Sequence, residues 1–339
     1  MDMTARSHVV PHPLPRGLQK GAMPSDYGDV GCEVDACFQR TALFDYSFLL
    51  RWTVSGSRAI SSVSTLCGRD FSDMPIGAIR YALTTDDAGW LQSDLTIWRT
   101  GRHSLEIMSG LATDVNLISD AIHKHDAVLT DMSDTTAVFA LQGPLTGDIL
   151  DTLHPDVPIS TIRKFWFADT HLASIPCRVG RLGFTGLDGV EIVCEANKAQ
   201  QLWDVVAALS QPAGFTAADQ IRIQAGLPLF SQDFVPGVSA SEVGLSHVRP
   251  MGKHSADLMD PRVRRVSFTA TLRDEAHFPQ PIGIAPFPPK DGTIFVTSIQ
   301  RVVGHTHVLG MGYIRFDQDL DSFADPLGVF SDITAHKVW

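Results

Sequence analysis

Long apolar runs, a signal peptide and paired cysteine motifs are all missing from this sequence. No run of about 18 apolar residues occurs, so no membrane-spanning helix is expected. The first residues, MDMTARSHVVPHPLPRG, contain no apolar stretch typical of a secretory signal, and we expect them to form a flexible tail. The five cysteines are scattered without a Cys-x-x-Cys pair, which indicates reduced thiols and a cytoplasmic protein.

Positive charge is also scarce. The chain has 27 Lys and Arg residues against 38 Asp and Glu residues, for a net charge of −11. This balance argues against nucleic acid and against an anionic membrane as partners, because phosphate binding needs clustered cations. It still permits a local basic pocket for a small anion. His305 and His307 lie two residues apart but have no evident third ligand, so no metal site is predicted.

The composition is that of a globular protein, with 44% apolar and 19% charged residues among 339, and this length predicts two or three domains. Strands are expected at 41–52, 137–140, twice within 165–182, and in a hairpin of 78–83 with 91–98. Helices are expected at 109–123, 143–153, after a cap at Asn197, and from a cap at Thr216 to Ile223. The upstream two thirds therefore read as α+β. The last third, with short pieces such as 265–272 and 292–298, reads as an all-β barrel or sandwich.

Residues 178–192 read RVGRLGFTGLDGVEI and combine a turn with the start of a strand. Gly186 and Gly189 bracket a tight connection, after which the strand begins. Glu191 lies early in this largely apolar strand, where burial of a carboxylate is costly unless a hydrogen-bond donor meets it. A neutral ring with N–H groups, a backbone amide and an arginine are three such donors.

A second carboxylate stands on the second strand of the expected hairpin. Asp94, Thr96 and Trp98 share one face of that strand, while Leu95 and Ile97 share the other. A carboxylate beside an amine can orient its N–H, stabilise positive charge or move a proton. The alternative is an aspartate exposed at the edge of a hairpin.

Several segments, in this order, resemble the folate-binding T-protein family of the glycine cleavage system and its relatives. The family's turn reads approximately Tyr-Thr-Gly-Glu-Asp-Gly-Phe-Glu-Ile, and residues 184–192 here read FTGLDGVEI. The other matching segments are LFD at 43–45, YALTTDDAG from Tyr81, SDLTIW from Ser93, ALQGP at 140–144, AADQIRIQAGLPLF at 217–230, VTS at 296–298 and MGYI at 311–314. Their order and spacing identify the chain as a member of this family over residues 40–315.

The resemblance implies an α+β fold arranged as a three-domain cloverleaf, with two α+β domains and a C-terminal β-barrel-like domain. The expected boundaries are 1–41 with 134–235 for a folate-binding domain, 42–133 for an inserted domain that carries Asp94, and 236–339 for the barrel. Members of the family move a one-carbon unit between an amine, ether or sulfonium compound and a nitrogen of tetrahydrofolate. The implied cofactor is therefore tetrahydrofolate, held in a central channel.

Three residues match functional positions of the family. Asp94 matches the aspartate near the reactive folate nitrogens and is the expected catalytic residue. Glu191 matches the glutamate that pairs with the pterin ring, since a carboxylate accepts two parallel hydrogen bonds from the 2-amino group and N3–H. Tyr81 matches an aromatic residue that lines the folate channel. The alternatives are a bond from Glu191 to backbone or to Arg181, and ordinary core packing of Tyr81.

The chain departs from the family pattern at several positions. The turn tyrosine is Phe184, a candidate cofactor contact that has lost the hydroxyl group. Ala218 replaces an arginine that helps to hold folate, and Arg222 on the same helix is either a cofactor contact or a structural residue. Ser93 replaces the first aspartate of an Asp-Asp pair. The family's Asn-Ala-Ala-Asn stretch is SGLA at 109–112, and Gly89-Trp90 replaces a glycine pair.

These departures favour a diverged tetrahydrofolate-dependent transferase over glycine-cleavage activity proper. We expect a demethylase or aminomethyltransferase that acts on a small N-, O- or S-methyl or aminomethyl donor, with a lipoylated carrier protein as a disfavoured donor. One alternative is a non-enzymatic folate-binding accessory protein of iron–sulfur assembly. The motif of that branch, Lys-Gly-Cys-Tyr-x-Gly-Gln, corresponds here to a cysteine-free stretch at 243–259. Another alternative is a degenerate relative that binds a different heterocycle or none.

Overall fold

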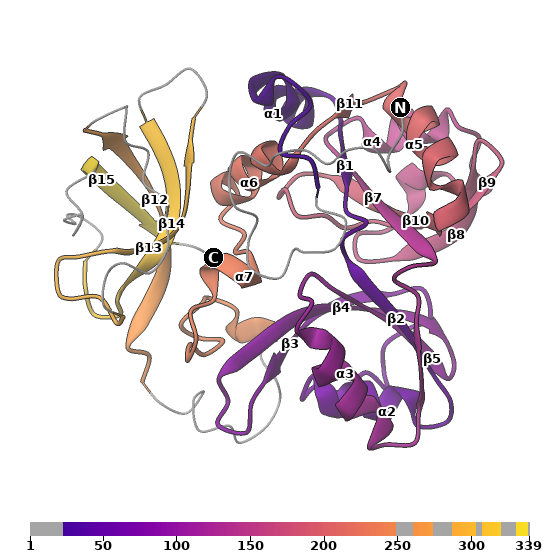
Figure 1. Ribbon diagram of the computed structural model, residues 1–339, viewed down its shortest axis with the longest axis horizontal. Helices are drawn as coiled ribbons and strands as arrows, with labels where there is room; N and C mark the ends of the chain where they lie inside the picture. The colour runs from indigo at the N-terminus through magenta and orange to yellow at the C-terminus, as the bar shows by residue number, and fades with distance from the viewer. Residues whose placement is uncertain (1–22, 249–259, 274–286, 303–306, 320–329, 338–339) are drawn as a thin grey trace. The chain divides into compact units, whose positions relative to one another are not determined.

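The computed structural model describes residues 23–248, 260–273, 287–302, 307–319 and 330–337 (Figure 1). It divides the chain into two compact units: Met1–Thr84 with Ser93–Ala218, and Thr85–Gln92 with Asp219–Trp339. Within the described ranges, no helix combines the length and the apolar character required to span a bilayer. The same ranges contain no group of three or more His, Cys, Asp or Glu residues that could hold a metal ion, and His305 lies outside them.

The first unit contains a six-stranded sheet in the order β11-β1-β7-β10-β9-β8. Its strands are β1 (Ala42–Asp45), β7 (Thr136–Gln142), β8 (Phe167–Leu172), β9 (Ile175–Gly180), β10 (Gly189–Glu195) and β11 (Gln211–Pro212). Neighbouring strands are antiparallel except β1 and β11, which run parallel. One face packs against α4 (Thr146–Asp151) and α5 (Ala199–Ala207) in a core that includes Phe139, Ile192 and Trp203. Glu191, which precedes the core residue Ile192, points to the other face of the sheet.

A five-stranded sheet, in the order β3-β4-β5-β2-β6, belongs mainly to the same unit. Its strands are β2 (Leu50–Ser55), β3 (Ile79–Thr85), β4 (Leu91–Gly101), β5 (Ser104–Ser109) and β6 (Val128–Asp131). Helices α2 (Ala59–Leu66) and α3 (Asp114–His123) lie side by side and bury one sheet face in a second core (Figure 1). Leu95 and Ile97 of β4 point into this core, as their alternation in the sequence predicts. The predicted hairpin of β3 and β4 is confirmed.

The single strand expected at 41–52 is wrong, because β1 and β2 join different sheets. A turn separates them, in which the Ser47 amide donates to Asp45 Oδ1 at 2.9 Å. The Leu49 amide donates to the Tyr46 carbonyl at 3.0 Å and closes the same turn. The apolar character of the segment is continuous because both strands are buried, so composition does not reveal the break.

Several helix boundaries also differ from those expected. Ser109 ends β5, and α3 begins five residues later at Asp114. Asn197 does not cap a helix but lies in a 3-10 turn (Ala196–Lys198) before α5. Thr216 lies inside α6 (Phe215–Gln224), and α4 is shorter than the range 143–153. Helix α1 (Val30–Gln39) begins at an Asp29 cap, whose carboxylate accepts from the Cys32 amide.

The second unit is mainly β, as expected for the last third of the chain. Its strands β12 (Val263–Leu272), β13 (Phe295–Arg301), β14 (His307–Arg315) and β15 (Phe330–Lys337) form an antiparallel sheet in the order β13-β14-β12-β15. The short helix α7 (Phe230–Asp233) precedes them. The described residues of this unit form an open sheet and not a closed barrel. The α+β class is therefore confirmed, while the three domain boundaries remain a prediction.

Candidate functional site

The turn that leads into β10 is held by its own side chains. Arg181 donates through Nε and Nη2 to both carboxylate oxygens of Asp188, at 3.0 and 2.7 Å. Gln142 is fully buried, donates to the carbonyls of Leu182 and Val190, and accepts from the Thr185 hydroxyl at 2.8 Å. These contacts fix the chain direction on both sides of the turn. They also occupy Arg181, so it is not the partner of Glu191.

Glu191 is a buried carboxylate without a partner. It is 8% exposed and makes no hydrogen bond or ion pair with any residue that the structure describes. Burial raises the pKa of Glu191 from its ordinary value of 4.5 to about 7, and the positive charge of Arg51 limits the rise. Such a group is costly in the ligand-free protein. Neither alternative for Glu191, a backbone donor or Arg181, is present in the described part of the chain.

Small residues flank Glu191 across the sheet. It pairs with Ala140 of β7 on one side and with Gly180 of β9 on the other. A Cβ atom at Gly180 would lie 2.2 Å from Cη2 of Trp98, so the indole of β4 packs directly on this glycine. Trp98 shares its strand face with Asp94, about 13 Å further along β4. The packing of Trp98 therefore places the strand of Asp94 over the sheet face that carries Glu191.

Asp94 is half-buried and accepts a hydrogen bond from the Tyr81 hydroxyl at 3.0 Å. Burial raises the pKa of Asp94 to about 6, the Tyr81 hydrogen bond lowers it, and the nearby Asp114 carboxylate raises it. A pKa in this range lets the carboxylate exchange a proton near neutral pH. The structure thus brings together Tyr81 and Asp94, and it excludes the alternative of an exposed aspartate at a hairpin edge.

Asp114 is a neighbour of this pair that the sequence did not suggest. Its side chain is 2% exposed and accepts hydrogen bonds from Ser109 Oγ at 2.5 Å and from Ser93 Oγ. Both serines occupy positions at which the chain departs from the family pattern. Each of these departures therefore supplies a hydroxyl group that donates to the Asp114 carboxylate. No signal in the sequence indicated Asp114, because the helix was expected to begin at Ser109. In the structure Asp114 is in the first turn of α3, where carboxylates are common.

Replacement of Asp114 by asparagine is expected to lower the pKa of Asp94, because a neighbouring negative charge is removed. A reaction that needs ionised Asp94 loses rate as the pH falls through the pKa of Asp94. In Asp114→Asn this loss should occur at lower pH, with the plateau rate at high pH retained. The pH dependence of one-carbon transfer measures the shift. An unchanged or upward shift would show that Asp114 does not act on Asp94.

Arg222 and Phe184 are the two remaining predicted contacts. Arg222 belongs to the second unit, where its guanidinium donates to Asp219, Asp233 and Ser298 and to two further oxygens, those of Gln232 and Leu227. All five N–H groups are used, which favours the structural alternative for Arg222. Phe184 is half-buried in the turn before β10.

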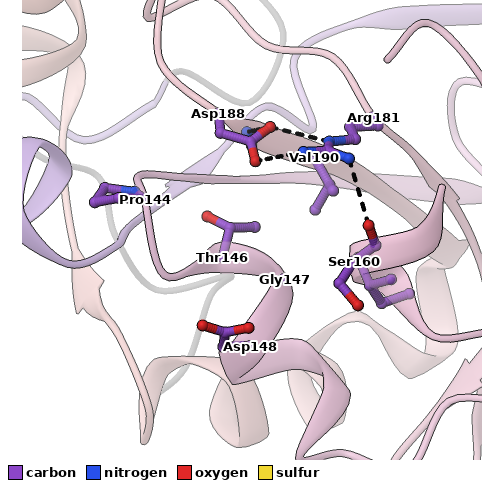
Figure 2. A pocket seen from close by; sticks show the side chains of 10 residues that line it. Pro144, Thr146, Gly147, Asp148, Ser160, Arg181, Asp188 and Val190 are labelled. Atoms are coloured by element: carbon purple, nitrogen blue, oxygen red, sulfur yellow. Dashed lines mark hydrogen bonds and ion pairs between the residues drawn. The ribbon is translucent and has the colours of Figure 1, made fainter. Parts of the chain in front are cut away.

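A small surface hollow lies beside the turn that leads into β10. Thr146 and Gly147 of α4 form one wall, and the Arg181–Asp188 pair and Val190 form the other (Figure 2). Val190 points to the core face of β10, so Glu191, the next residue, points away from the hollow. Tyr81 and Asp94 do not line it either. The hollow is therefore separate from the site of Glu191.

Comparisons of this chain with a family model and with curated proteins identify the same family. The model of the GCVT N-terminal domain matches residues 19–253. The aminomethyltransferase of Thermotoga maritima is 31% identical over 239 residues, which cover 68% of this chain and 65% of that protein. The aminomethyltransferase of Geobacillus thermodenitrificans is 31% identical over 231 residues, which cover 66% of this chain and 63% of that protein. The matches thus span just under two thirds of these curated relatives.

A solved structure shares the fold. The crystal structure of glycine cleavage system aminomethyltransferase T from Bartonella henselae matches with a TM-score of 0.72 at 20% identity, over 86% of this chain and 83% of that chain. The family model covers more than half of the chain and includes β4 and β10, the strands of Asp94 and Glu191. The chain therefore belongs to the family of the GCVT N-terminal domain.

Proposed function

We propose that the chain catalyses one-carbon transfer to tetrahydrofolate from a small N-, O- or S-methyl or aminomethyl donor. The observation that supports this most is the buried Glu191 carboxylate, which has no partner among the described residues. The pterin edge presents two parallel N–H donors, and a carboxylate accepts both at once. Binding would offset the desolvation of Glu191, so the residues present fit this group.

Tetrahydrofolate supplies the nucleophilic nitrogen that accepts the one-carbon unit. The proposed role of Asp94 is to stabilise positive charge beside that nitrogen and to take up its proton. The Tyr81 hydroxyl fixes the orientation of the carboxylate through the 3.0 Å hydrogen bond. With a pKa of about 6, Asp94 is mainly ionised at neutral pH and can act as the base. Tyr81 is therefore a positioning residue and Asp94 the proposed catalytic residue.

The proposed donor is a free small molecule, and the proposed location is the cytoplasm. The departures at Ser93, Phe184 and Ala218 support a donor different from the aminomethyl-loaded lipoyl carrier of glycine cleavage. All five cysteines are free thiols, as a reducing compartment would leave them. Four of them are buried and none forms a disulfide, which supports the proposed location.

Isotope tracing tests this function. The purified protein is incubated with tetrahydrofolate and with carbon-13 methyl compounds of the N-, O- and S-linked classes in turn. Labelled methyl-tetrahydrofolate from one of them is the expected result, and a labelled free aminomethyl compound should give labelled methylene-tetrahydrofolate. Turnover only with glycine-derived aminomethyl groups on a lipoylated carrier would contradict the proposed donor. Tetrahydrofolate binding without transfer from any donor would instead favour the accessory or degenerate alternatives.

A further inference from the structure

Arg51 is a buried cation that the proposed mechanism does not use. It lies on β2 and is 5% exposed. Its Nη2 donates to Glu106 of β5, and its backbone amide donates to Ser133 Oγ at 3.0 Å. Its Nε has no hydrogen-bond partner among the described residues. A buried N–H donor left without an acceptor is uncommon and costs about 1–3 kcal/mol, so a missing partner is expected.

The register of the six-stranded sheet places this donor near Glu191. Glu106 also accepts from Arg178 of β9, and Arg178 pairs with Val193 of β10. Val193 and Glu191 point to the same sheet face and are two residues apart, or about 7 Å. Arg178, the end of the Arg51–Glu106–Arg178 chain of ion pairs, therefore stands one residue pair along the same face of the sheet from Glu191. Among the residues that the structure describes, Arg51 is the charged neighbour that acts on the Glu191 carboxylate.

The two groups without partners are complementary. Glu191 is a double acceptor, whereas Arg51 Nε is a single donor. A ring edge that satisfies both needs two N–H groups followed by an acceptor oxygen. The 2-aminopyrimidin-4-one edge has this order: the amino group, the ring N–H and the carbonyl at C4.

We propose that Arg51 is a specificity-determining residue, whose Nε–H donates to the C4 carbonyl of the heterocycle that Glu191 binds. The inference rests on the proposed function, because it deepens the recognition of the same pterin ring. The inference implies that the protein prefers a heterocycle with an oxygen at C4. A ring with an amino group in place of the C4 oxygen would direct N–H groups at a guanidinium and leave Arg51 Nε unsatisfied.

Tetrahydrofolate and tetrahydroaminopterin are the test pair. The amino group at C4 of tetrahydroaminopterin replaces the oxygen that would face Arg51, and its ring also lacks the N3–H donor that Glu191 accepts. Isothermal titration at pH 8 is expected to show that the wild-type protein binds tetrahydrofolate at least about tenfold more tightly, one hydrogen bond's worth of free energy. In Arg51→Lys, which keeps a positive charge for Glu106 but has no Nε–H donor, this ratio should fall by about tenfold, while the part due to the missing N3–H donor remains. In Arg51→Met it should fall likewise, which covers the case in which lysine disturbs folding.

Glu106→Gln is the control variant. It breaks the same chain of ion pairs but leaves Arg51 Nε–H in place, so the ratio of the two affinities should stay at its wild-type value. Equal weakening of both ligands in the Arg51 variants, or an unchanged ratio, would contradict the inference and indicate a structural role for Arg51. If the wild-type protein binds neither compound, the proposed function itself fails and this inference fails with it.

Discussion

Replacement of Asp94 by asparagine is expected to lower the rate of one-carbon transfer by about 10²–10⁴-fold, the usual contribution of a general acid–base group. Asparagine cannot take up a proton and carries no charge to stabilise a cationic nitrogen. Its amide oxygen still accepts the hydrogen bond of the Tyr81 hydroxyl, so the hairpin geometry is retained. The affinity for tetrahydrofolate should therefore change little, and the loss should appear in kcat.

Tyr81→Phe is the matched control for this substitution. It removes the hydrogen bond that lowers the pKa of Asp94, so this pKa should rise further above its ordinary value. The rate, which needs ionised Asp94, should then fall away at higher pH than in the wild-type protein. Far above that pKa, the variant should keep most of its activity. Asp94→Asn with near wild-type kcat would contradict a catalytic role for Asp94.

Replacement of Glu191 by glutamine should have opposite effects on ligand binding and on stability. Tetrahydrofolate affinity should fall by about 100-fold, because a charge-assisted double hydrogen bond is lost. The ligand-free protein should nevertheless become more stable at pH 8, by about 1–2 kcal/mol. This is the gain from removing a buried charge, of about 3 kcal/mol, less the cost of a buried amide without a partner.

The pH dependence of stability follows from the raised pKa of Glu191. Well below pH 4.5 the carboxyl group is protonated in both the folded and the unfolded state, so its titration adds no pH dependence to the free energy of unfolding. Between pH 4.5 and about 7 the unfolded state ionises first, so stability falls as the pH rises. Above about 7 the loss is complete. Glu191→Gln removes this decline.

Urea unfolding of the two proteins without ligand, at pH 5 and pH 8, measures the difference. Glutamine should stabilise the protein more at pH 8 than at pH 5. A variant that is less stable than the wild-type protein at pH 8 would show that Glu191 has a stabilising partner. The carboxylate would then not be unsatisfied in the ligand-free protein. Circular dichroism provides the check that both proteins fold.

Local patterns in the sequence predicted part of this fold. The hairpin of β3 and β4 and the turn before β10 follow from alternation and from glycine positions within a dozen residues. Ala173 and Ser174 adopt positive φ values of 48° and 66° at the expected β8–β9 turn. The break between β1 and β2 was missed because both halves are apolar, and only their membership of two sheets separates them.

The candidate site was predicted only where a single residue carried the signal. Asp94 and Glu191 stand out as carboxylates in apolar strands, and a family pattern assigned them roles. Asp114 and Arg51 did not stand out, because their significance comes from contacts across 21 and 55 positions of the chain, to Ser93 and Glu106. Arg222 shows the converse: its position in a motif suggested a ligand contact, but its N–H groups are all used within the fold.

Titration of tetrahydrofolate into the wild-type protein at pH 8 and pH 6 tests the central claim most directly. The ionised form of Glu191 is the acceptor, and its pKa of about 7 separates these two conditions. We predict that the wild-type protein binds tetrahydrofolate at pH 8 and binds it about tenfold more weakly at pH 6, because one carboxylate must ionise before it can bind. In Glu191→Gln this pH effect should be absent. No binding at pH 8, or the same pH effect in Glu191→Gln, would contradict the assignment of Glu191 as the pterin-binding residue.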